Sequence, residues 1–270
     1  MFRADLHCHT TFSDGTLTPQ QLLQHAKEME LLGISITDHD TVEAYSIAPK
    51  LAKELGILLG TGVEFSCVFQ KMSVHLLGYD VDLDSPAIAK LCTRHQERRR
   101  LRNKAILNNL SRLGMSISEE ELLAVSDRTL GRPHIAKLMV EKGYASSIKE
   151  AFNQYLGDGK PCYARGDEIS VQETIEIIHQ SRGKAFLAHP HLLKHSRKIK
   201  ELLKCSFDGI ECYYGKFSSD QENRWIQIAK ERGWLVSGGS DFHGSSKDYI
   251  QLGCAWVDED NFHKIFQHLM

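Results

Sequence analysis

The sequence of 270 residues predicts an α/β barrel that is interrupted by a helical insertion. Strand and helix patterns alternate over residues 1–84 and again over 162–270, which favours parallel strands joined by helical crossovers. Seven strand candidates in roughly 190 residues favour a barrel over an open sheet, and no glycine-rich phosphate loop follows the first strand. Residues 85–161 show helical periodicity and almost no strand pattern, so we expect an insertion there.

Capping residues and glycines bound the elements of the first part of the chain. Thr18 and Pro19 are typical of an N-cap and the first residue of a helix, and Gly33 and Gly56 are typical of helix ends. We therefore expect helices from Pro19 to about Gly33 and from about Val42 to Leu55, and strands at Ala4–Cys8, Ile34–Thr37, Ile57–Val63 and Ser73–Tyr79.

The insertion and the last part of the chain carry further helix starts. The predicted starts are Ser118-x-x-Glu121, Pro133, Ser147-x-x-Glu150, Ser170-x-x-Glu173 and Ser219-x-x-Glu222. Further strands are predicted at Ala185–Ala188, Gly209–Tyr213 and Trp234–Gly238. A basic run spans residues 94–104. Helical spacing there turns Leu101, Ala105 and Leu110 inward, so we expect most of its charges to be solvated, with Arg99, Arg100 or Arg102 as possible contacts to substrate.

Composition excludes several classes of protein. Lys and Arg total 33 against 35 Asp and Glu, and this balance argues against extensive adhesion to nucleic acid or membrane. No apolar run reaches the roughly 18 residues that span a bilayer, and the N-terminus lacks a signal-peptide core, so we expect a cytoplasmic chain. The seven cysteines include no CxxC pair and are expected to be reduced and mostly buried. The unusual feature is the count of 14 histidines.

Many of these histidines stand where a predicted strand ends. The carboxyl ends of barrel strands open onto one face, so residues distant in sequence meet there. His7 and His9, two residues apart on a strand, point to the same side, as do Asp241 and His243. The candidate metal ligands are His7, His9, Asp14, His39, Glu64, His75, His189, Asp241 and His243.

Nine candidate ligands exceed the four to six that one ion needs, which indicates two or three ions bridged by a carboxylate such as Glu64. Imidazoles and carboxylates without cysteine suit Zn, Mn or Fe. A single histidine near a strand end is more often an ordinary hydrogen-bonded residue. That interpretation fits His25, His95, His179, His195, His263 and His268.

The proposed ligands also stand in motifs that resemble the PHP (polymerase and histidinol phosphatase) family. These motifs are Asp5-Leu6-His7-Cys8-His9-Thr10, Ser13-Asp14-Gly15, Thr37-Asp38-His39-Asp40, Gly62-Val63-Glu64-Phe65, Val74-His75-Leu76-Leu77-Gly78, Ala188-His189-Pro190 and Gly239-Ser240-Asp241-Phe242-His243. The resemblance implies a distorted seven-stranded (βα)7 barrel in residues 1–84 and 162–270, a small inserted helical subdomain in residues 85–161, and a trinuclear metal site, with manganese the expected ion.

The resemblance also assigns the ligands to three ions. His7, His9, Glu64 and Asp241 would hold one ion, Glu64, His75 and His189 a second, and Asp14, His39 and His243 a third. His191 is an extra histidine, either a neighbour or a residue that orients a ligand. Asp38 could orient a ligand, and Asp38 or Asp40 could instead be an N-cap.

Within the insertion, Gly131-Arg132-Pro133-His134-Ile135-Ala136 and Phe152-x-x-Tyr155-Leu156 resemble the subgroup of 3′,5′-nucleotide bisphosphate phosphatases, which also contains a 5′-3′ exoribonuclease. Arg132 and His134 at a helix start are the candidates for binding a second phosphate, the alternative being a salt bridge near the cap. Arg165 and Lys216 are weaker candidates.

The expected chemistry is attack on phosphorus by a water that metal ions deprotonate near neutral pH. The leading hypothesis is a phosphoesterase that removes the 3′-phosphate of nucleoside 3′,5′-bisphosphates and can also trim short RNA from its 5′ end. The alternatives are a histidinol-phosphate phosphatase and a non-enzymatic metal-binding module. We expect a small nucleotide or oligonucleotide as partner, with no membrane and no obligate protein partner.

Overall fold

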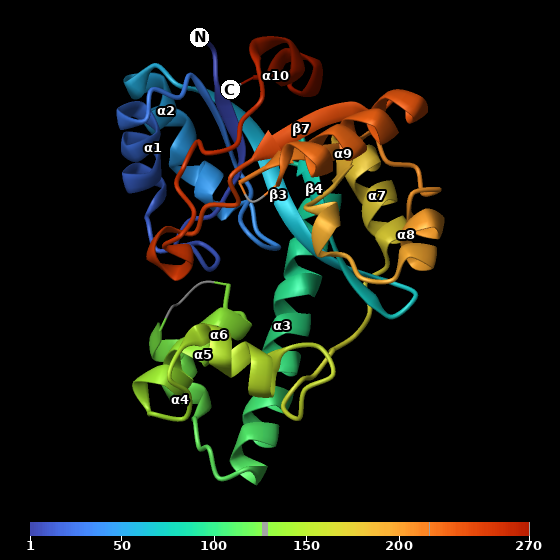
Figure 1. Cartoon of the computed structure of the whole chain (residues 1–270). Helices are drawn as coiled ribbons and strands as arrows, with labels where there is room; N and C mark the ends of the chain where they lie inside the picture. The colour runs from blue at the N-terminus through green and yellow to red at the C-terminus, as the bar shows by residue number, and fades with distance from the viewer. Residues whose placement is uncertain (126–128, 216, 270) are drawn as a thin grey trace. The chain divides into compact units, whose positions relative to one another are not determined.

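Seven strands lie in sequence order in one sheet, within the part of the chain that the computed structural model describes, residues 1–125, 129–215 and 217–269 (Figure 1). They are β1 (Ala4–Cys8), β2 (Gly33–Ile36), β3 (Leu58–Phe69), β4 (Met72–Tyr79), β5 (Lys184–Leu187), β6 (Gly209–Tyr214) and β7 (Leu235–Gly239). The sheet curls so that β1 meets the end of β7, where the amide of Asp241 donates to the carbonyl of His7 at 2.7 Å. The predicted seven-stranded, nearly closed barrel is confirmed.

Helices flank these strands within a first unit that comprises Met1–Cys92 and Ile169–Met270. They are α1 (Pro19–Glu28), α2 (Ala48–Leu55), α7 (Val171–Gln180), α8 (Ser196–Leu202), α9 (Ser219–Arg232) and α10 (Glu259–Ile265). Figure 1 shows α1 and α2 on one flank of the strands and α7, α8 and α9 on the other. Phe262 and Phe266 pack with Leu6, Leu77 and Phe186 of the strands, so the α10 segment completes the barrel core.

One strand departs from the expected parallel order. β4 runs antiparallel to both β3 and β5, whereas the other neighbouring pairs are parallel. The reason is a two-residue hairpin turn at Gln70 and Lys71, which have φ angles of 47° and 65°. A turn with two positive φ angles suits the twist of an antiparallel pair, and a crossover helix is then unnecessary.

Two predicted helix starts also need correction. The expected helix from Val42 to Leu55 is a short 3₁₀ turn, Glu43–Ser46, followed by α2, which has Pro49 in its first turn. A proline is accommodated at a helix start because it lacks an amide hydrogen. The N-cap of α9 is Ser218 rather than Ser219, because Gln221 three residues later closes a reciprocal cap with Ser218. A glutamine can close such a cap as well as a glutamate, and Gln21 does the same with Thr18 at the start of α1.

The second compact unit comprises Thr93–Glu168. It contains the end of α3 (Pro86–Arg112), then α4 (Glu119–Val125), α5 (Arg132–Glu141) and α6 (Ile148–Ala151). Its apolar core draws Ile106 and Leu110 of α3 together with Ile135 and Met139 of α5. The predicted insertion of residues 85–161 overlaps this unit, and the domain boundaries themselves stay a prediction.

The basic run on α3 is oriented differently from the expectation. Leu101 is 45% exposed, whereas Arg98, Arg99 and Arg102 are each only 8% exposed. The prediction that most of these charges are solvated is therefore wrong for three arginines. A guanidinium is planar and weakly hydrated, so it enters an interior more readily than an ammonium does.

The meeting of β1 and β7 requires a glycine and a buried acid. A Cβ at Gly239 would lie 2.3 Å from the amide nitrogen of His7, so only glycine permits this approach. The carboxylate of Asp5 accepts from the amides of Ser240 at 2.9 Å and Gly253 at 2.8 Å. Burial raises the pKa of Asp5 to about 6, although these hydrogen bonds act in the opposite direction. Asp5 thus joins three backbone segments at the closure.

A buried tyrosine joins β2 to β3. The hydroxyl oxygen of Tyr45 lies 2.8 Å from the carbonyl oxygen of Ile36 and 2.9 Å from that of Gly60, and it accepts from the amide of Gly62 at 2.7 Å. We expect Tyr45→Phe to lower the free energy of unfolding in urea by about 1–3 kcal/mol, because buried backbone groups lose their partner. The control is Tyr249→Phe, at a ring that is 62% exposed, and it should change stability by less than about 0.5 kcal/mol. Equal effects of the two variants would contradict this account.

Candidate metal centre

The centre is built around the buried carboxylate of Glu64 on β3. One oxygen, Oε2, lies 3.3 Å from His7 Nε2, 3.2 Å from His9 Nε2 and 3.0 Å from His39 Nδ1. The other, Oε1, lies 2.8 Å from His75 Nδ1 and 2.9 Å from His189 Nε2. Histidines from β1, β4 and the segments after β2 and β5 therefore surround one carboxylate.

Asp241, after β7, completes the first group of predicted ligands. Its Oδ1 lies 3.5 Å from His7 Nε2 and 3.3 Å from His9 Nε2. His7, His9, Glu64 and Asp241 thus offer four buried ligand atoms within 4.8 Å of one another. They are the same four residues that the sequence assigns to one ion.

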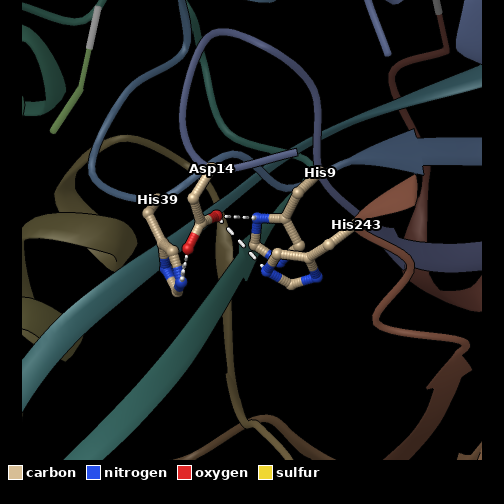
Figure 2. Close-up of side chains that lie close together, drawn as sticks. All are labelled: His9, Asp14, His39 and His243. Atoms are coloured by element: carbon tan, nitrogen blue, oxygen red, sulfur yellow. Dashed lines mark ion pairs between the residues drawn. The ribbon is translucent and has the colours of Figure 1, made fainter. Parts of the chain in front are cut away.

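A further group lies around Asp14, in the loop after β1. Figure 2 shows Asp14 between His39 on one side and His9 and His243 on the other. Its Oδ1 lies 3.2 Å from His243 Nε2 and 3.8 Å from His9 Nδ1, and its Oδ2 lies 3.8 Å from His39 Nε2. His39 also contacts Glu64 through its other ring nitrogen, so it lies between the two carboxylates. The structure thus brings all nine predicted ligands together.

The spacing and orientation of these atoms fit metal binding. Atoms bound to one ion at about 2.1 Å stand about 3.0–3.4 Å apart, and the nitrogen–oxygen distances around Glu64 fall near that range. Among the described residues, Nε2 of His7 and Nε2 of His9 are buried without a partner at hydrogen-bonding geometry. Buried polar atoms rarely lack partners, so these nitrogens are aimed at a shared point that a cation would occupy. The His, Glu and Asp clusters are able to bind metals.

Opposite charges determine the protonation of these groups. Burial disfavours the ionised acid, yet His39 and the other imidazoles hold the pKa of the Glu64 carboxyl well below its usual value. Burial also disfavours an imidazolium, yet the carboxylates of Asp241 and Glu64 raise the pKa of His9 to about 9. Because the pKa of His9 is raised, an ion that binds there must displace its proton, whereas burial and the Lys247 ammonium lower the pKa of His243.

The second oxygen of Asp241 is held away from the histidines. Oδ2 accepts from the hydroxyl of Tyr214 and from Nζ of Lys247, both at 2.7 Å. Burial opposes ionisation, but the Lys247 ammonium helps to keep the pKa of Asp241 well below its usual value. These two donors fix the carboxylate plane, so that Oδ1 faces His7 and His9.

Glu211 on β6 contacts two of the proposed ligands, although no role was predicted for it from the sequence. It is fully buried, its Oε1 lies 2.8 Å from Nδ1 of His7, and its Oε2 accepts from the backbone amide of His189 at 2.6 Å. A carboxylate at this position accepts a hydrogen bond from Nδ1–H of His7, which keeps the proton on Nδ1 and leaves the lone pair of Nε2 for the ion. The available signal was a charged residue in the middle of an apolar strand, Gly-Ile-Glu-Cys-Tyr-Tyr.

Asp38 and Asp40 do not cap a helix. Asp38 accepts from the amide of Thr10 at 2.7 Å and the hydroxyl of Ser13 at 2.6 Å. Asp40 accepts from the amide of Ser66 at 2.9 Å. The N-cap predictions are therefore wrong. Asp38 instead fixes the loop that leads to Asp14.

The predicted phosphate-binding residues lie in the second unit, where they have contacts of their own. Nη1 of Arg132 donates to the carbonyl of Leu156 and to Asp158 Oδ1, both at 3.2 Å. Nδ1 of His134 accepts from the amide of Gly131 at 3.1 Å. The role of Arg132 and His134 in phosphate binding stays a prediction, and Lys216 lies outside the described residues.

A nearly closed α/β barrel that holds clustered imidazoles and carboxylates is an arrangement suited to metal-dependent hydrolysis. The model of the PHP domain family matches residues 5–224, and the chain belongs to this family. The resemblance stated from the motifs is confirmed. The chain is a hydrolase of phosphate esters, so the interpretation as a module without activity is set aside.

Three similar proteins illustrate the range of the family. The 5′-3′ exoribonuclease Rnm of Salmonella typhimurium is 32% identical over 94% of this chain and 87% of its own. The 3′,5′-nucleoside bisphosphate phosphatase of Chromobacterium violaceum is 30% identical over 94% of this chain and 91% of its own. The crystal structure of a metal-dependent phosphoesterase from Bifidobacterium adolescentis has a TM-score of 0.88 at 30% identity, over 97% of this chain and 94% of that one. No described helix is long and apolar enough to cross a membrane.

The protonation of the centre predicts a pH dependence. Because the pKa of His9 is raised to about 9, protons compete with metal ions at neutral pH, and affinity should rise as pH increases toward that value. We expect the affinity for Mn²⁺ to rise at least tenfold between about pH 6.5 and 8.5, with proton release. Calorimetry in two buffers of different ionisation enthalpy measures both quantities. The control is His25→Asn, outside the centre, which should show the same pH dependence as the wild-type chain. An affinity for Mn²⁺ that does not change with pH, without proton release, would contradict the prediction.

The contacts of Glu211 predict its effect on metal binding. The Glu211 carboxylate now has two partners, the ring of His7 and the backbone amide of His189. In Glu211→Gln only one side-chain oxygen remains to accept, so His7 or His189 loses its orientation. We expect a 10- to 100-fold weaker metal affinity with an unchanged fold, measured by competition with a chelating dye and by circular dichroism. The matched control is Glu201→Gln, on the exposed helix α8. An unchanged affinity would show that Glu211 serves stability alone.

Proposed function

We propose that this phosphoesterase acts on nucleotides. It removes the 3′-phosphate of nucleoside 3′,5′-bisphosphates and also trims short RNA from the 5′ end, using two or three divalent ions, of which manganese is the expected one. The observation that carries the phosphoesterase chemistry is the set of five histidine nitrogens within 3.3 Å of the Glu64 carboxylate. The names of the relatives from Salmonella typhimurium and Chromobacterium violaceum support the nucleotide substrate.

The proposed ligands follow the assignment of the sequence. His7, His9, Glu64 and Asp241 would hold one ion, Glu64, His75 and His189 a second, and Asp14, His39 and His243 a third. When bound, the ions supply positive charge to the phosphate oxygens and lower the pKa of a coordinated water.

The surrounding residues keep this arrangement in place. Glu211 holds the Nδ1 proton of His7, and Tyr214 and Lys247 orient Asp241. Seven of the nine proposed ligands are buried, whereas His39 and His75 are partly exposed, so the charges of the buried ligands are little screened by water. No Ser or Cys nucleophile is needed for this chemistry.

Arg132 and His134 are the proposed contacts to a second phosphate. In support, the guanidinium of Arg99, which is 8% exposed, lies against Gly131 at the start of α5, where a Cβ would be 3.1 Å from Nη1. Cationic side chains and helix-start amides within the second unit thus share one region, which suits an anion.

The test is a substrate panel with the Mn²⁺-loaded chain. We expect phosphate release from adenosine 3′,5′-bisphosphate and mononucleotide release from short 5′-phosphorylated RNA, with histidinol phosphate cleaved at least tenfold more slowly. Arg132→Gln should raise KM about tenfold for the bisphosphate and leave KM for adenosine 3′-monophosphate unchanged. Asp158→Asn is the matched control, since it breaks the same ion pair without removing the cation. Cleavage of neither nucleotide substrate would overturn the proposal.

A further inference from the structure

A cluster of three aromatic side chains lies beside the metal centre, and only one of them, Tyr214, has a stated role in orienting a proposed ligand. The ring centroids of His191 and Phe217 are 4.4 Å apart with the planes at 88°. Tyr214 lies 4.7 Å from His191 and 5.3 Å from Phe217 by the same measure. The amide of Phe217 donates to the carbonyl of Tyr214 at 2.9 Å, and this turn sets the two rings side by side.

This aromatic cluster, His191, Tyr214 and Phe217, is tied to the proposed ligands at its inner end. The Tyr214 hydroxyl donates to Asp241 Oδ2 at 2.7 Å. The Tyr214 ring lies 6.1 Å from that of His189, and His191 follows His189 by two residues on a short 3₁₀ turn. A molecule whose phosphate is held by the ions would therefore have these rings next to it.

The outer end of the cluster reaches solvent. Tyr214 is 5% exposed, but His191 and Phe217 are only half-buried, and the neighbouring Leu192 is 54% exposed. Lys247, whose side chain is 30% exposed, adds a cation at the same oxygen of Asp241. Partly exposed rings beside a cation are typical of surfaces that bind nucleotides, where the ring contacts the base and the cation the phosphate.

We propose that Phe217 and His191 form an aromatic contact surface for the nucleobase of the substrate. Because their ring planes stand at 88°, the base would stack on one ring and meet the edge of the other. This inference rests on the proposed nucleotide activity and adds to it the part of the molecule that is recognised. Stacking on an aromatic ring is tolerant of base identity, because every base has a π face. The enzyme should therefore distinguish substrates with a base from substrates without one, while showing little preference among bases.

Phe217→Ala tests the proposal with two substrates, adenosine 3′,5′-bisphosphate and ribose 3,5-bisphosphate, which lacks the base. For the nucleotide we expect KM to rise about 5- to 100-fold with kcat unchanged, and for the ribose compound we expect no change. Phe217→Tyr should keep the wild-type values. Phe69→Ala, a half-buried ring at the end of β3, is the matched control and should change neither KM. Equal effects of Phe217→Ala on both substrates would overturn the proposal.

A binding measurement separates this inference from the proposed activity. The fluorescence of 2-aminopurine riboside 5′-monophosphate is quenched when its base stacks on a ring, and no turnover is needed. We expect quenching with the wild-type chain and with Phe217→Tyr, and none with Phe217→Ala. If the wild-type chain cleaves no nucleotide, the proposed function fails. The quenching then tests base binding by itself: its loss in Phe217→Ala supports the aromatic surface, and equal quenching in Phe217→Ala contradicts it.

His191→Phe distinguishes stacking from metal binding. This substitution keeps an aromatic ring but removes both ring nitrogens. If His191 contacts the base, the variant should keep the wild-type KM for the nucleotide and the wild-type metal content, measured by atomic emission. Loss of about one ion per chain in this variant would show that His191 is a ligand, and the stacking role of His191 would be overturned.

Discussion

The structure depends on one buried carboxylate, that of Glu64. An isolated ionised carboxylate in a protein interior is strongly disfavoured, so it must be surrounded by cations or by hydrogen-bond donors. Here the partners are imidazoles from different strands: His7 on β1 and His9 directly after it, His75 within the antiparallel β4, and His189 after β5. A barrel provides this convergence because the ends of its strands form a ring. The fold and the ligand set are thus two aspects of one constraint.

A layer of further buried acids keeps the ligands in register. Glu211 contacts the ring of His7 and the backbone of His189, whose φ of 27° is unusual for a residue other than glycine. Asp5 joins β1 to the end of β7, and Asp38 fixes the loop before Asp14. Each of these carboxylates accepts from at least one backbone amide. A displacement of one of these acids therefore moves more than one ligand. This is a physical reason for the deep burial of Glu211, Asp5 and Asp38, which are not among the proposed ligands.

The sequence predicted most strand ends to within one residue, but β3 continues six residues beyond the predicted end at Val63, so Glu64 lies within the strand. Several other features were predicted poorly, for physical reasons. Motifs such as His7-Cys8-His9 mark a strand end because the two-residue period of a strand puts both rings on one side. The direction of β4 was not predictable, because an apolar strand reads the same in a parallel or antiparallel sheet, and the turn at Gln70 and Lys71 lacks the usual glycine or asparagine. The burial of Arg98 and Arg102 was missed because helical periodicity treats arginine as exposed, while the structure buries these side chains. Glu211 was missed because a single acid in a strand does not reveal its partners.

The metal centre by itself cannot select a substrate. Its ligands act on a phosphate group, and every phosphate ester presents the same non-bridging oxygens to them. Selection must come from residues that contact the remainder of the molecule. In the first unit, Lys247 and the aromatic cluster border the centre and offer a charge and a ring face. A ring face adds binding energy only for a substrate with a planar group near its phosphate, which a nucleotide has and a simple sugar phosphate lacks. Two enzymes with the same ligands can therefore differ in substrate through a few residues outside the ions, and at about 30% identity those residues decide the activity.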